Sequence, residues 1–170
     1  MIKAYRILSY VLLFFGFFLS MGVMMLLGLA FSNPAILLTL FILAAVVLYT
    51  FSSYRFLRIG IDKGQILKKS KRDFIKVNAY VAMIFAVMNF VQSLTVMLDP
   101  KFLNDMLKQI DQIQQSAGST SAAHLASIIK IVLWVFLFYA VALGTHIFIS
   151  FQLLKKYSGL FSDIHTEHKP

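Results

Sequence analysis

Four long apolar stretches alternate with shorter polar segments along the chain. The first, residues 7–31, carries no charged side chain, and an α-helix needs about 20 apolar residues to cross a hydrocarbon core of about 30 Å. Three further apolar stretches lie at 34–54, 74–98 and 126–154, and the last two each carry a single lysine, Lys76 and Lys130. The pattern therefore predicts an all-α fold, a single membrane domain built as a four-helix transmembrane bundle.

The first two stretches are separated by a very short turn. In this turn Asn33 is suited to cap the next helix and Pro34 to begin it, because the first helical position needs no backbone N–H donor. So short a connection predicts a tight antiparallel hairpin. Gly16 and Ser20 have the small-xxx-small spacing that lets two membrane helices approach closely, and they indicate a packing face on the first helix.

The third and fourth stretches are joined by a longer and more polar segment. Within 100–115 the apolar residues recur along one helical stripe, while most charged residues lie away from it. This pattern predicts an extra amphipathic helix that lies along the membrane surface or caps the bundle. A linker of small residues follows at 116–123, and residues 157–170 are expected to form a partly flexible tail.

A strongly basic segment, 55–76, follows the second stretch and orients the protein. Its cationic residues are Arg55, Arg58, Lys63, Lys68, Lys69, Lys71, Arg72 and Lys76. Of the 16 Lys and Arg residues, the only ones on the opposite side of the predicted bundle are Lys101, Lys108 and Lys130. Because basic residues are seldom translocated, the crowded side is predicted to be cytoplasmic, and both termini lie on that side.

The overall composition supports a membrane setting. The chain is 59% hydrophobic and 14% charged, whereas soluble domains have about 25% charged residues. A net charge of +9 would suggest nucleic acid in a soluble protein, but here the basic residues flank apolar spans. We therefore expect anionic lipid headgroups as partners and no nucleic acid. The alternative for the basic segment is docking of a cytoplasmic protein with an acidic surface.

Several tyrosines give a second indication of orientation. An amphipathic ring is favourable at the level of the lipid headgroups, and six of the tyrosines fall near the predicted cytoplasmic boundary. They are Tyr5, Tyr10, Tyr49, Tyr54, Tyr80 and Tyr157. We expect them to lie at the membrane interface.

Residue patterns that support catalysis are missing from the sequence. None of the 7 Asp and Glu residues lies inside an apolar stretch, although intramembrane carboxylates are the usual proton and cation sites of transporters. The sequence contains no cysteine, no HExxH or GxSxG motif, and no phosphate-binding glycine loop. We therefore predict no catalytic residues, no metal site, no cofactor and no enzymatic activity.

Polar side chains within the third and fourth stretches form a candidate interior face. These residues are Asn78, Asn89, Gln92 and Ser93 in the third stretch and Tyr139, His146 and Ser150 in the fourth. Because an unsatisfied amide is costly in hydrocarbon, they are expected to point into the bundle and bond across helices, with His146 neutral. Two alternatives stay open. His146 could sense pH, since imidazole titrates near neutrality, and the amides could line a water-filled path or a docking face.

The segment YRFLRIGIDKGQILKKSKRDFIKVNAYV, residues 54–81, resembles the central loop of small four-span bacterial membrane proteins of unknown function. Ile59, Ile61, Lys63 and Gly64, followed by the basic run at 68–72, carry the likeness. The resemblance supports the four-span topology, and it brings no catalytic residues. Separately, the distribution of basic residues leads us to expect a bacterial cytoplasmic membrane.

Together these features predict a non-enzymatic, multi-pass inner-membrane protein. We expect it to act by association, as an accessory or regulatory subunit, with another membrane protein or a second copy of itself as partner. The alternative is a small homo-oligomeric transporter or channel lined by the polar faces of the third and fourth spans.

Overall fold

The computed structural model describes residues 1–99, 101, 105 and 122–162. Four long helices account for most of this chain: α1 (Ile2–Ala30), α2 (Leu37–Arg55), α3 (Lys69–Leu98) and α5 (Ala122–Lys156). Each belongs to a helical segment that is long and apolar enough to cross a membrane. The predicted all-α fold with four transmembrane helices is confirmed. The expected amphipathic helix at 100–115 lies almost wholly outside the described residues.

The surfaces of the four helices are apolar on most sides. In the most apolar part of each segment, no more than 22% of the residues are buried inside the protein. Large apolar side chains such as Phe14, Phe41 and Phe148 point outward, each with 62% of its surface exposed. A helix that is apolar all round needs an apolar environment, so the outer surfaces are suited to lipid.

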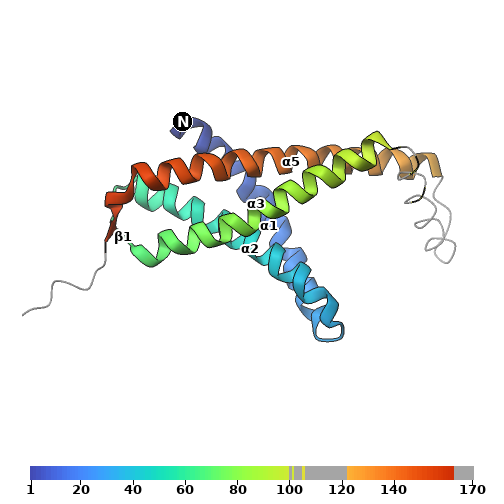
Figure 1. The fold of residues 1–170 in the computed structure, drawn as a ribbon, viewed down its shortest axis with the longest axis horizontal. Helices are drawn as coiled ribbons and strands as arrows, with labels where there is room; N and C mark the ends of the chain where they lie inside the picture. Colours follow the sequence, from blue (N-terminus) through green and yellow to red (C-terminus); the bar gives the residue numbers. More distant parts are fainter. Residues whose placement is uncertain (100, 102–104, 106–121, 163–170) are drawn as a thin grey trace, which may run out of the picture. The chain divides into compact units, whose positions relative to one another are not determined.

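The first two helices form the predicted hairpin. Figure 1 shows α1 and α2 running side by side and joined by a short turn. In that turn the Asn33 side chain accepts a hydrogen bond from the Ala35 amide at 3.1 Å, and Pro34 begins the 3-10 turn η1 (Pro34–Ile36) that leads into α2. The predicted roles of Asn33 and Pro34 are confirmed.

Gly16 lies where α1 and α2 approach each other closely. A Cβ atom placed on Gly16 would lie 3.0 Å from Cγ2 of Thr50 on α2, so only a glycine lets the two helices come this near without adjustment. Ser20, in contrast, donates its hydroxyl proton to the Phe17 carbonyl of its own helix. The small-residue spacing therefore identified the correct face of α1, with Gly16 as the contact residue.

Much of the basic segment is helical. After Arg55 the chain continues as a π-helical turn, η2 (Phe56–Ile61), which Gly60 does not interrupt. The turn ends near Gly64, whose φ of 63° lies in the left-handed region that favours glycine. Because α3 already begins at Lys69, only a short non-helical connection remains.

A short strand pairing was not expected from the sequence. Strand β1 (Leu67–Lys68) pairs in parallel with β2 (Phe161–Ser162), which follows the 3-10 turn η3 (Ser158–Leu160). The Phe161 ring stacks on Phe56 with the ring centroids 5.5 Å apart. The connection before α3 is thus joined to the segment that follows α5.

The described chain divides into two compact units. One comprises Met1–Phe85 with Ala142–Pro170, and the other comprises Ala86–Val141. In the first unit α1 and α2 pack with the beginning of α3 and the end of α5, and its core includes Leu12, Val46, Leu143 and Ile147, all with 0% exposure. The second unit holds the end of α3 and the beginning of α5.

Candidate functional site

A cluster of buried polar side chains lies inside the first unit, where α1, α2 and α5 meet. We call it the His146 cluster. Its members are Tyr5, Ser9, Tyr49, Ser53, His146 and Ser150. None of them has more than 2% of its surface exposed. Because buried polar groups are costly unless they are paired, the hydrogen bonds of this cluster decide whether the three helices can pack there.

Both ring nitrogens of His146 have partners. Ser9 Oγ lies 2.9 Å from Nε2, and the Tyr49 hydroxyl lies 2.8 Å from Nδ1. A neutral imidazole has one donor and one acceptor nitrogen, and a hydroxyl can fill either role. The two contacts therefore satisfy a neutral ring in either tautomer.

Tyr5 completes the cluster by stacking on the His146 ring. Its ring stacks on the imidazole of His146, with centroids 4.5 Å apart and the planes tilted by 10°. Its hydroxyl donates to the Ser53 carbonyl at 3.4 Å and lies 3.2 Å from Ser150 Oγ. One tyrosine of α1 thus contacts both α2 and α5, and the cluster links all three helices.

The chemistry of the cluster is that of a closed hydrogen-bond network. A serine hydroxyl at hydrogen-bond distance from an imidazole is the arrangement of an activated nucleophile. Here, however, Ser9 is 2% exposed and His146 is 0% exposed. The nearby backbone N–H groups belong to helix interiors, where they bond to carbonyls one turn earlier and leave no donors for an oxyanion. In this conformation the network holds helices together and admits no substrate.

The sequence pointed to His146 and Ser150 but missed the partners that α1 and α2 provide. Tyr5 and Tyr49, expected near the membrane interface, have side chains that turn inward, where their hydroxyls find partners. The sequence did contain a signal for these partners. Tyr5 with Ser9, Tyr49 with Ser53, and His146 with Ser150 are each spaced four residues apart, which places both members of a pair on one helix face.

Asn78 of α3 lies in the first unit, but its amide bonds within its own helix. Asn78 is 8% exposed and donates its side-chain amide to the Phe74 carbonyl of its own helix at 2.8 Å. Ser93 and Tyr139 are buried in the second unit, at 2% and 3% exposure. The expected interior face is therefore divided, with Asn78, His146 and Ser150 in one unit and Ser93 and Tyr139 in the other.

Asn89 and Gln92 lie beside a cavity in the second unit. Asn89 is partly buried, and its Nδ2 atom has no hydrogen-bond partner among the described residues. Gln92 is exposed, in contrast to the interior position expected for it. Both residues line a cavity of about 350 Å³ with Ser93 and with apolar side chains of α5 that include Ile128 and Phe136. The second unit therefore presents two amides beside an apolar crevice.

The eight cations of the basic segment separate into distinct groups. Arg55, Lys68 and Lys71 line one cavity of about 410 Å³, and Arg72 and Lys76 line another of about 390 Å³. Arg58 donates a hydrogen bond to the Tyr54 hydroxyl at 3.1 Å. Lys63 and Lys69 are exposed, Lys63 near Gly64 and Lys69 at the start of α3. Five of the eight cations thus line two cavities.

Comparisons with protein-family models, with curated proteins and with solved structures find no match for this chain. Among the described residues, no group of three metal-binding side chains comes together. The candidate sites of the described chain are therefore the His146 cluster, the two amides beside the apolar crevice, and the cavities lined by the basic segment.

Proposed function

We propose that the chain is a multi-pass protein of a bacterial inner membrane that acts by associating with another membrane protein. Catalysis has little support, because the described Ser–His contact is sealed from substrate. The resemblance of residues 54–81 to small four-span bacterial membrane proteins agrees with this setting. An accessory or regulatory subunit is the role that these features favour.

The observation that carries this proposal is the exposed amide of Gln92 beside Asn89. At a rise of 1.5 Å per residue, Asn89 lies about 15 Å along the helix axis from Asp99 and about 20 Å from Lys76. This is close to the middle of the apolar part of α3. An amide at that depth is costly against lipid but can hydrogen-bond to a polar group of another transmembrane helix. A partner helix on this face would provide hydrogen bonds for the amide.

The association is testable by photocrosslinking in native membranes. A photoreactive amino acid at Met88, which is 61% exposed and one turn from Gln92, leaves both amides in place. We expect a covalent adduct with a second, larger protein, and we expect Asn89→Leu with Gln92→Leu to reduce its yield about tenfold or more. A photoreactive residue at the exposed Phe14 of α1 provides the lipid-facing control.

Other outcomes of this experiment are equally informative. Thr95→Val is a matched variant, because the Thr95 hydroxyl already bonds to the Val91 carbonyl of its own helix. It should leave the adduct unchanged. Adducts only between copies of this chain, together with solute flux in liposomes, would favour the homo-oligomeric transporter or channel instead. Lipid adducts alone would contradict association through this face.

The proposed orientation makes a separate prediction. Alkaline phosphatase, which folds only outside the cytoplasm, is expected to be inactive when fused after Ser162 and active when fused after Asp99. The physical reason is that the basic residues between Arg55 and Lys76 resist translocation. Green fluorescent protein fused at the same positions should give the opposite pattern. Active phosphatase after Ser162 would reverse the proposed topology.

A further inference from the structure

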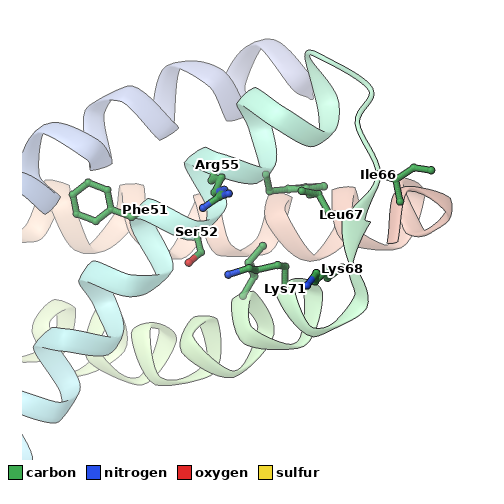
Figure 2. Close-up of a pocket in the computed structure, with 9 residues that line it drawn as sticks. Phe51, Ser52, Arg55, Ile66, Leu67, Lys68 and Lys71 are labelled. Carbon is green, nitrogen blue, oxygen red and sulfur yellow. The ribbon is translucent and has the colours of Figure 1, made fainter. Parts of the chain in front are cut away.

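The cavity lined by Arg55, Lys68 and Lys71, here called the basic pocket, lies in the first unit between α2 and α3. Phe56 and Ile75 form an apolar floor and are only 1% and 2% exposed. Figure 2 shows Arg55, Ser52 and Lys71 around the same space, with Lys68 at its edge. A volume of about 410 Å³ is within the range of small-molecule sites.

Three chain segments hold the pocket in shape. The end of α2 and the start of α3 form two of its walls, and the connection with Leu67 and Lys68 forms the third. Gly60 lets Leu67 approach closely, since a Cβ there would lie 3.2 Å from Leu67 Cδ1. The pairing of Leu67 with Phe161 in β2 fixes this connection further. The pocket is therefore a preformed site.

The pocket also spans a boundary in polarity. Phe51, which is 42% exposed, belongs to the uncharged stretch that precedes Arg55, whereas the cations begin at Arg55 itself. The apolar end of the pocket is therefore suited to lipid tails and the charged end to headgroups. A soluble anion would use only the charged end.

The basic pocket brings together three cations. Among the residues that the structure describes, no carboxylate forms an ion pair with Arg55, Lys68 or Lys71. Like charges around one cavity repel each other, and an anion between them removes this repulsion. Arginine and lysine both bind phosphate well. We propose that the basic pocket binds one anionic glycerophospholipid, with its phosphate among the cations and the start of an acyl chain against Phe51 and Ile75.

A discrete lipid site differs from a diffuse attraction of basic residues to a charged membrane surface. A diffuse attraction depends on the number of charges and little on their positions. A discrete site depends on which charges are present and on the space between them. The two can therefore be separated with variants of equal net charge.

Native mass spectrometry of the full chain, released from detergent with defined lipids, provides the measurement. We expect one phosphatidylglycerol per chain, bound about tenfold or more tightly than phosphatidylcholine with the same acyl chains. Changing Arg55, Lys68 and Lys71 together to Gln should weaken this binding about tenfold or more. The control changes Lys3, Lys63 and Lys156 to Gln, which removes the same charge from exposed positions outside the pocket, and should alter affinity less than about twofold.

A second variant tests the space without changing any charge. Ser52→Phe places a ring in the pocket and is expected to reduce phosphatidylglycerol binding about fivefold or more, which a diffuse attraction would not do. It also keeps the proposal testable if the triple variant fails to fold. Equal losses in both triple variants, no effect of Ser52→Phe, or full displacement of the lipid by glycerol 3-phosphate would overturn the proposal.

Discussion

Replacing His146 by alanine is expected to lower the free energy of unfolding by about 3 kcal/mol. The change removes the hydrogen bonds that His146 makes with Ser9 Oγ and with the Tyr49 hydroxyl in a fully buried region. It also leaves a cavity where the imidazole stacks on Tyr5. Each loss acts at the same junction, so we expect α1 and α5 to separate first.

Reversible unfolding in mixed detergent micelles measures this effect. Phe148→Ala on the same helix is the matched control, since Phe148 is 62% exposed and its removal leaves no buried cavity. His146→Gln should be milder than His146→Ala, because an amide can keep one of the two hydrogen bonds. If His146→Ala were as stable as the Phe148 control, the cluster would not be what holds these helices together.

Replacing Gly16 by leucine is expected to destabilise the α1–α2 hairpin by about 2 to 3 kcal/mol. Even a bare Cβ at this position meets Thr50 Cγ2 at 3.0 Å, and the Thr50 hydroxyl is bonded to the Val46 carbonyl, which restricts its rotation. A leucine side chain therefore forces the two helix backbones apart. The same unfolding assay reports the loss.

Gly22 supplies the control for this experiment on the same helix. A Cβ at Gly22 has no neighbour within 4 Å, so Gly22→Leu should leave stability unchanged or raise it slightly through better helix propensity. Equal losses in the two variants would mean that the close approach at Gly16 is unimportant. A cross-link between α1 and α2 that still forms in Gly16→Leu would lead to the same conclusion.

The four helices could be predicted from the sequence because each depends on a local property. An uncharged stretch such as 7–31 is long enough to span a bilayer whatever surrounds it. The helix ends were harder to place. The second helical segment continues to Ile61 and α3 begins at Lys69, because a helix can extend past the membrane into the region where charged side chains are solvated.

The members of the His146 cluster on α1 and α2 could not be predicted with the same success. His146 stood out as an ionisable residue in an apolar stretch, but its partners lie 97 and 137 residues away in the chain. Which residues of α1 and α2 face it depends on how the helices rotate and shift against one another, and that is a property of packing. For the same reason Gln92, placed in the interior by helical spacing, lies on an exposed surface.

The pairing of β1 with β2 has a consequence for the order of biogenesis. Leu67 leaves the ribosome long before Phe161, which follows the last long helix. The connection between the second and third helices therefore acquires its final form only after Phe161 has been synthesised. Nascent chains stalled before Phe161 should be cut near Gly64 by a protease added to opened membranes, whereas chains extended beyond Ser162 should resist it.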